Sequence, residues 1–134
     1  MLEMRTVTTD EFVQWLHAEA RAHGNRLDHD PDALRPYFDL DRSIAVLDEG
    51  NIVGGAHSHR LEMSIPGASA VVAGVANIYV QPTHTRRGVM TRMMHHQIND
   101  IHERGEPMAA LFARESIIYR RFGYGIGSLH ERWT

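Results

Sequence analysis

Cysteine is absent from this chain of 134 residues, and other absences narrow its chemistry further. Without cysteine, neither disulfide bonds nor a thiolate nucleophile is possible. No apolar run approaches the length of a membrane span, and the first residues lack the apolar core of a signal peptide. The net charge of −3 and the lack of a basic stripe argue against nucleic acid as the main partner. We therefore expect a soluble, cytoplasmic protein.

Length and patterning fit one domain, residues 1–134, whose hydrophobic share of 43% is enough for a core. Apolar periodicity and turn residues predict strands, and helices between them. The expected strands are Met4–Val7, Ile44–Leu47, Ile52–Met63, Ser69–Val80, Met108–Ala113 and Ser128–Trp133. Four helices are expected. The first follows a capping box at Thr8–Glu11, and the second begins at Asp30 and is limited in length by Pro36. The third runs from about Arg87 to Glu103, and the fourth covers Glu115–Arg121.

The order of these elements predicts a mixed α/β sheet. The strand–helix–strand unit from Ser69 to Ala113 requires a parallel, right-handed crossover, whereas the strands before it form an antiparallel meander. The first long helix should bury Phe12, Val13, Leu16 and Ala20; the helix near Arg87 should bury Met90, Met93, Met94, Ile98 and Ile101.

A strand that turns into a helix at Arg86-Arg87-Gly88 is typical of a phosphate site. The first turn of a helix leaves backbone N–H groups unpaired, and the helix dipole favours an anion there. Glycine lets a ligand approach the backbone, and arginines add charge-assisted hydrogen bonds. The plain alternative is a solvated helix cap. A nucleoside-triphosphate loop is excluded, because no Gly-Lys-Ser/Thr triplet is present.

Two motifs carry a family resemblance: Pro82-Thr-His-Thr-Arg-Arg-Gly88 and Ile118-Tyr-Arg-Arg-Phe-Gly-Tyr-Gly125. They resemble the GNAT superfamily of N-acetyltransferases, and most closely the N-terminal domain of the Eis-like (enhanced intracellular survival) acetyltransferases. The resemblance implies the GNAT acyl-CoA N-acyltransferase fold, a mostly antiparallel mixed sheet with helices on both faces. It also implies transfer of an acetyl group from acetyl-CoA to a primary amine, either of an aminoglycoside- or polyamine-like small molecule or of a lysine.

The resemblance and the loop chemistry together assign the site. Arg86, Arg87, Gly88 and the amides of Val89, Met90 and Thr91 would hold the pyrophosphate of the cofactor. The main chain of Ile78, Tyr79 and Val80 would hold the pantetheine arm, although Ile78 and Val80 also suit plain core packing. By resemblance, Tyr119 is the acid that protonates the leaving thiolate; its alternative is a half-buried aromatic at a helix end. Thr85 departs from the family, which usually has an arginine there.

The base that accepts the amine proton stays open. His84 matches a family histidine but is expected to brace the loop. His57 and His59 lie two residues apart on a strand and therefore share one face. They could supply a base or a metal pair, but we interpret them as plain surface residues. Glu62, Glu131, the carboxylate of Thr134 and a water relay are further options. We expect no metal.

Two other functions remain possible at this stage. One is a CoA-binding module with little catalysis, which Thr85 favours. The other is a fragment, because Eis-like proteins continue into a second acetyltransferase-like domain and a sterol-carrier-like domain. The family's last strand has no residues left in this chain. An unpaired sheet edge invites pairing, so we expect a homodimer or higher homo-oligomer, or a missing C-terminal segment.

Overall fold

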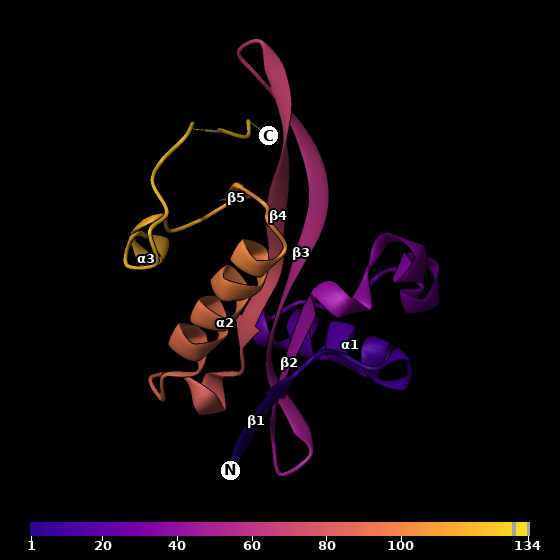
Figure 1. Ribbon diagram of the computed structural model, residues 1–134. Helices are drawn as coiled ribbons and strands as arrows, with labels where there is room; N and C mark the ends of the chain where they lie inside the picture. The colour runs from indigo at the N-terminus through magenta and orange to yellow at the C-terminus, as the bar shows by residue number, and fades with distance from the viewer. Residues whose placement is uncertain (130, 134) are drawn as a thin grey trace.

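A five-stranded sheet organises the computed structural model, which describes residues 1–129 and 131–133 (Figure 1). The spatial order follows the chain: β1 (Leu2–Arg5), β2 (Ser43–Asp48), β3 (Asn51–Ile65), β4 (Ala68–Val80) and β5 (Met108–Leu111). The pairs β1–β2, β2–β3 and β3–β4 are antiparallel, and β4–β5 is parallel. The predicted mixed, mostly antiparallel sheet is therefore confirmed.

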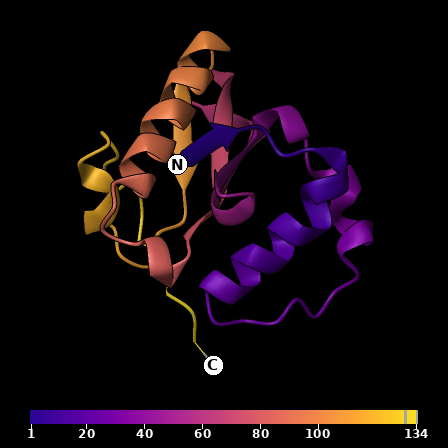
Figure 2. The ribbon, with the colours of Figure 1, turned by 90° about the horizontal axis from the view of Figure 1, so that it is seen from below.

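Helices cover both faces of this sheet, as predicted (Figures 1 and 2). α1 (Phe12–Ala22) lies on one face and α2 (Val89–Glu103) on the other, while the four-residue α3 (Ile117–Arg120) lies beside α2. Successive residues of β2 supply the two cores in turn. Ala45 and Leu47 pack with α1, and Ile44 and Val46 pack with Val89 and Met93 of α2.

The α1 helix begins where predicted, because the Thr8 amide donates a 3.2 Å hydrogen bond to Oε2 of Glu11. A short 3₁₀ turn, Thr9–Glu11, precedes it. Its buried face differs in part from the prediction. Phe12 and Leu16 are buried as expected, but Val13 and Ala20 are only half-buried; Trp15 and Ala18 are the other fully buried residues. The indole N–H of Trp15 donates to the Ile44 carbonyl at 2.9 Å, which fixes α1 to the sheet.

Three predicted elements are corrected by the structure. Residues 31–37 form a 3₁₀ helix, Pro31–Tyr37, that contains Pro36 instead of stopping before it. Helix α2 starts at Val89 rather than Arg87, since Gly88 has a left-handed φ of 76°. The strand predicted at Ser128–Trp133 is wrong for the described residues of that range, which are irregular. Leu129 and Trp133 are 90% and 86% exposed, so no burial offsets the entropy of ordering a strand there.

Smaller differences concern the ends of elements. The first strand lies two residues earlier than predicted, β5 ends at Leu111, and α3 is shorter than Glu115–Arg121. On α2, Met93, Met94 and Ile101 are buried as predicted, whereas Met90 and Ile98 are half-buried. Among residues 1–129 and 131–133, no helix is long and apolar enough to cross a membrane.

Candidate functional site

The loop between β4 and α2 turns the chain sharply and leaves a helix start open. After the 3₁₀ turn Pro82–His84, Arg86 takes a left-handed φ of 61° and Gly88 one of 76°. Gly88 is the N-terminal cap of α2, has no side chain to pair with the first amides, and is exposed. A Cβ on Gly88 would meet no other atom within 4 Å. The N–H groups of the first turn, Val89 to Thr91, have no partner within the helix, and Gly88 offers them no side-chain acceptor.

Both arginines of the loop are exposed. Within the part of the chain that the structure describes, neither guanidinium makes a hydrogen bond or an ion pair. The structure thus brings Arg86, Arg87, Gly88 and the amides of Val89, Met90 and Thr91 together in one turn, with positive charge and free donors. Such a turn suits a multiply charged anion.

His84 links this loop to the end of β2. Its Nε2 lies 2.8 Å from Oδ2 of Asp48, at the end of β2, and its Nδ1 lies 2.8 Å from the hydroxyl of Thr83. The hydrogen bond from His84 lowers the pKa of the Asp48 carboxyl. The hydroxyl of Thr85 donates to the Pro82 carbonyl at 3.0 Å, so it closes the turn. These contacts fit the predicted bracing role of His84.

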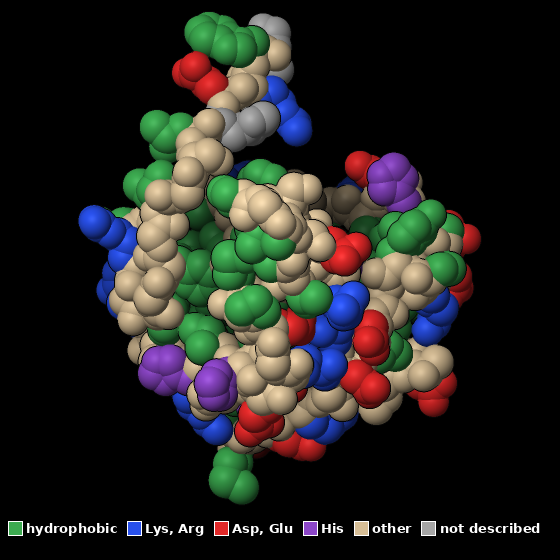
Figure 3. Space-filling view, turned by 45° about the horizontal axis from the view of Figure 1, so that its top comes forward, with side chains coloured by type: hydrophobic (Ala, Val, Ile, Leu, Met, Phe, Trp, Pro, Cys, Tyr) green, Lys and Arg blue, Asp and Glu red, His purple; other side chains and the backbone are tan. Residues whose placement is uncertain are grey.

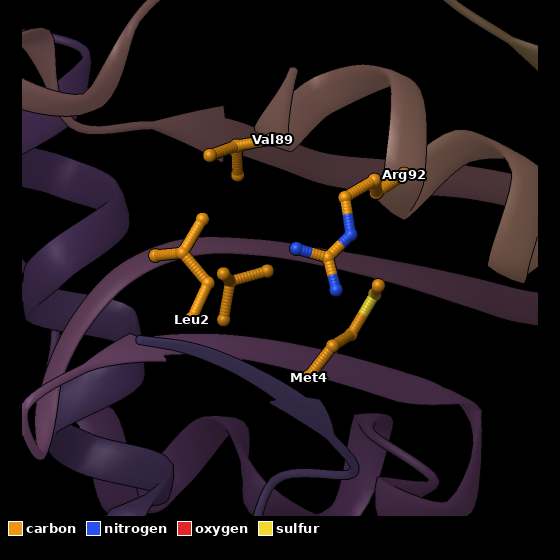
Figure 4. A pocket seen from close by; sticks show the side chains of 5 residues that line it. Leu2, Met4, Val89 and Arg92 are labelled. Carbon is orange, nitrogen blue, oxygen red and sulfur yellow. The ribbon is translucent and has the colours of Figure 1, made fainter. Parts of the chain in front are cut away.

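The start of α2 is also held by packing. Leu2 and Met4 of β1, Val46 of β2, and Val89 and Arg92 of α2 surround a small apolar pocket (Figure 4). Its cavity volume is about 0 Å³, so it holds no ligand. Because Val89 is only 2% exposed, the first residue of α2 is anchored in the core while Gly88 beside it stays open.

The end of β4 carries the other predicted cofactor residues. β5 pairs with β4 over Val72–Val75, and within the described chain β4 has no partner on that side beyond Val75. The backbone edge of Ile78–Val80 is therefore free, as a bound pantetheine arm requires. Side chains point elsewhere: Ile78 and Val80 pack on the α2 side, and Tyr79 packs under α1, its hydroxyl donating to the Trp15 carbonyl at 3.1 Å. Core packing and main-chain availability thus coexist, as the sequence allowed.

A β-bulge marks the point where β4 leaves β5. Gly55 pairs with Tyr79, but His57 pairs with Ala76, so two residues of β4, Asn77 and Ile78, stand opposite one residue of β3. Asn77 adopts a left-handed φ of 56°, a conformation that Asn tolerates better than most residues. The bulge redirects backbone groups at the free edge of the strand.

Tyr119, the predicted acid, lies on α3. Its ring is half-buried and contacts the ring of Tyr124 edge to face, with centroids 6.2 Å apart. Burial raises the pKa of Tyr119, so its hydroxyl keeps its proton at neutral pH. Phe122 contacts His95 of α2 at 5.8 Å, and both ribbon views place α3 on the side of α2 that faces away from α1 (Figures 1 and 2). Tyr119 therefore comes from a different element than the loop, on the α2 side of the sheet.

A larger cavity, of about 340 Å³, lies by the C-terminal half of α2. Its lining comes from α2, the start of β5 and the segment 122–125, and includes Ile101, Glu106, Met108, Phe122 and Tyr124. Figure 3 shows apolar side chains gathered in a hollow beside the C-terminal segment. No residue of the Arg86–Thr91 turn lines this cavity, so the cavity is separate from that turn.

The two strand histidines are not plain surface residues. His57 is completely buried, its ring 4.7 Å from that of Phe38 and 4.5 Å from that of His59. Burial, with smaller effects of His59 and Arg42, lowers its pKa to about 3. No group of three or more His, Cys, Asp or Glu side chains that could bind a metal occurs in residues 1–129 and 131–133. Of the other candidate bases, Glu62 and Glu131 are exposed, and Thr134 lies outside the described residues.

Sequence reasoning missed one polar residue, Glu19 of α1. Its Oε2 accepts a 2.7 Å hydrogen bond from Nδ2 of Asn77, at the bulge of β4. Burial raises the pKa of Glu19, while the Asn77 bond and nearby His23 act in the opposite direction. A signal was present: Glu19 lies three and four residues after Leu16 and Trp15, which places a carboxylate on the apolar stripe of the helix.

Comparison with known proteins identifies the class to which this architecture belongs. The family model described as an acetyltransferase (GNAT) domain matches residues 3–127. The chain therefore belongs to the GNAT acetyltransferase family, and the predicted family and fold are confirmed.

Individual relatives agree. An uncharacterized N-acetyltransferase of Streptomyces avermitilis is 38% identical over 129 residues, which cover 94% of this chain and 32% of that protein. The crystal structure of Eis1 from Mycobacterium abscessus matches with a TM-score of 0.82 and 34% identity, over 94% of this chain and 31% of that one. A predicted acetyltransferase of Clostridium acetobutylicum, crystallised with acetyl-CoA, matches 100% of this chain and 96% of its own with a TM-score of 0.81; its 17% identity shows the fold alone. The chain spans about a third of the first two proteins.

Proposed function

We propose that this chain binds acetyl-CoA and transfers its acetyl group to a primary amine. The observation that carries the proposal is the turn at Arg86–Thr91, where two unpaired arginines and a bare helix start stand directly after a strand with a free edge. The pyrophosphate would receive hydrogen bonds from the amides of the first turn and from the guanidinium groups. Membership of an acetyltransferase family supports acetyl-CoA as the anion.

The free edge of β4 then sets the direction of the bound cofactor. The pantetheine arm would add to the Ile78–Val80 backbone like an extra strand, with its amides replacing the missing partner. Following β4 back from the loop leads to the bulge at Asn77, about 10 Å along the strand from Val80 at roughly 3.3 Å per residue. The thioester would lie near this bulge.

Tyr119 supplies the acid. When the amine nitrogen attacks the thioester carbonyl, the carbon–sulfur bond breaks and the thiolate needs a proton. Burial keeps the Tyr119 hydroxyl protonated throughout the neutral range, so it is a competent donor. Its place on the α2 side puts it on the side of the sheet from which the cofactor loop also comes.

For the acceptor we propose a small cationic amine, of aminoglycoside or polyamine type, with a lysine side chain as the further option. Acidic residues gather between α1 and β2, but several act locally. The carboxylates of Asp30 and Asp39 accept the amides of Asp32 and Asp41, and Asp32 also pairs with Arg35. Such a segment attracts cations at long range without selecting one. Cytoplasmic location and a homo-oligomeric state stay predictions.

A CoA-binding module with weak catalysis is the second candidate. The hydroxyl of Thr85 is already bonded to the Pro82 carbonyl, so this position offers the phosphates less than an arginine would. The two candidates differ in turnover but not in cofactor binding.

The test combines the protein with acetyl-CoA, a panel of amines and a thiol reagent. We expect amine-dependent release of CoA, and a loss of roughly 10²- to 10⁴-fold in Tyr119→Phe, the range attributed to a general acid. Tyr124→Phe is the matched control, because it removes a neighbouring buried hydroxyl that has no hydrogen-bond partner among the described residues. Thermal stabilisation by CoA without turnover would favour the binding module. Equal activity of Tyr119→Phe and Tyr124→Phe would remove Tyr119 from the mechanism.

A further inference from the structure

A carboxylate on the buried side of α1 faces the bulge of β4. Glu19 follows the buried residues Trp15, Leu16 and Ala18 on the helix, and its side chain is half-buried against the sheet. Its Oε2 accepts the Asn77 amide at 2.7 Å. Across residues 1–129 and 131–133, its second oxygen, Oε1, has no hydrogen-bond partner. A position that only had to pack would carry an apolar residue, because burying a carboxylate is costly.

We propose that Glu19 is the general base that accepts the proton of the acceptor amine. This inference rests on the proposed function. The lone pair of the amine nitrogen forms the new carbon–nitrogen bond, and the nitrogen passes one proton to Oε1 of Glu19. The carbon–sulfur bond breaks, and Tyr119 gives its hydroxyl proton to the sulfur. Afterwards Glu19 releases a proton to water and Tyr119 regains one from water, so the enzyme is restored.

The layout of the sheet supports this assignment. The anion-binding turn and α3 lie on the α2 side, whereas Glu19 comes from α1 on the opposite face (Figures 1 and 2). With the cofactor entering from the α2 side, the α1 side is the face left for the amine. Asn77 belongs to the bulge near which the proposed thioester lies, and its amide fixes the orientation of the Glu19 carboxylate. Acid and base then approach the reacting carbon from two sides.

The electrostatic surroundings of Glu19 also suit a base. Burial raises its pKa towards the neutral range, where a carboxylate accepts protons more readily. The groups that act against this shift are the Asn77 amide and His23 on its own helix. On β4, which packs against α1, burial raises the pKa of the Tyr79 hydroxyl; the Glu19 carboxylate raises it further, and Arg21 lowers it. The raised pKa makes the Glu19 carboxylate a better proton acceptor than an exposed one.

The histidines are weaker candidates for this role. Both ring nitrogens of His84 are within hydrogen-bond distance of Asp48 and Thr83, which commits them to bracing the loop. His57 is completely buried, and a pKa of about 3 makes it a poor proton acceptor. Glu19 is the carboxylate that the structure brings to the bulge.

The first variant is Glu19→Gln, which keeps an oxygen that can accept the Asn77 amide but loses the basic group. We expect kcat/KM for the amine to fall by roughly 10²-fold or more, and the acidic limb of its pH profile to disappear. CoA affinity and the melting temperature should stay near those of the wild type. Glu103→Gln, on the exposed side of α2, removes the same charge and should change none of these quantities.

The second variant, Asn77→Gly, shifts the pKa of Glu19 while leaving the Glu19 side chain itself unchanged. Glycine accepts the left-handed φ at this position, so the backbone stays relaxed, but the hydrogen bond that favours the ionised carboxylate is lost. The acidic limb should then move to higher pH, which a purely structural role of Glu19 does not predict. A limb unchanged in Asn77→Gly, or Glu19→Gln with wild-type turnover, would overturn the inference and leave the proposed function standing. Wild-type protein without any amine-dependent CoA release would overturn both.

Discussion

The open space above Gly88 gives the sharpest test of the anion-binding turn. Gly88 has a φ of +76°, and a Cβ there would meet nothing within 4 Å. Gly67, in the Pro66–Gly67 turn of the β3–β4 hairpin, has a φ of +78° and equally open surroundings. Alanine at either position therefore suffers the same backbone strain, roughly 1–2 kcal/mol for a left-handed L-residue. At about 4 °C per kcal/mol, both variants should melt a few degrees below the wild type.

Binding should separate the two variants. In Gly88→Ala the new methyl group would occupy the space through which, in the proposed binding mode, a phosphate oxygen reaches the first-turn amides. Losing one hydrogen bond to a charged group costs roughly 1.5–3 kcal/mol, which is about a 10- to 150-fold increase in Kd. Gly67→Ala should bind CoA as the wild type does. Calorimetric titration with CoA measures the difference directly. If both variants bind CoA with equal affinity, the turn at Gly88 does not hold the pyrophosphate.

Two further predictions concern stability. Glu106 and Arg42 form a buried ion pair, with Nη2 of Arg42 2.6 and 2.9 Å from the two carboxylate oxygens. Because Glu106→Ala leaves the arginine buried without its partner, the free energy of unfolding measured in urea should fall by about 3–5 kcal/mol. The same substitution at exposed Glu103 should change it by less than about 0.5 kcal/mol. A cost below about 1 kcal/mol for Glu106→Ala would contradict the burial of this pair. Burial lowers the pKa of His57 to about 3, whereas in the unfolded chain its pKa is near 6.5. Between these pH values only the unfolded chain binds the proton, so the free energy of unfolding should fall as the pH drops from about 6.5 towards 3. His57→Leu should make this pH dependence flatter. Unfolding measured at several pH values would refute this if both proteins show the same slope.

Local signals explain why the shape of the turn from β4 into α2 was predictable. Pro82 ends the strand, Gly88 takes the left-handed conformation, and the apolar pattern of α2 begins next to it; each is set by neighbouring residues. The predicted helix start was two residues early, because the sequence does not reveal that Gly88 rather than Arg87 is the cap. The free edge of Ile78–Val80 was predicted from family resemblance and agrees with the short β4–β5 ladder.

The features that were missed depend on contacts between distant parts of the chain. The bulge at Asn77 arises from the register against Ala56 and Gly55 on β3, which no local pattern encodes. The buried ring of His57 packs at a tilt against the ring of Phe38, which is 19 residues earlier in the chain. The strand predicted at 128–133 is the clearest miss, because residue types show only that a strand could form there. A strand also needs a neighbour for its backbone groups, and the described residues of that range have none.

The two parts of the proposed site, the turn before α2 and helix α3, differ in how strongly the rest of the fold holds them. The turn is fixed by the His84–Asp48 contact, by the Gln81 amide bonded to the Val53 carbonyl at 2.8 Å, and by buried Val89. By contrast, α3 has four residues, and Ile117 at its start is 73% exposed. Aromatic contacts hold it: Tyr119 touches Tyr124, and Phe122, just after the helix, touches His95 of α2. A helix so short has little stability of its own. Substitutions in α3 should therefore affect acetyl transfer far more than CoA affinity, because the proposed cofactor contacts come from elements that do not depend on α3.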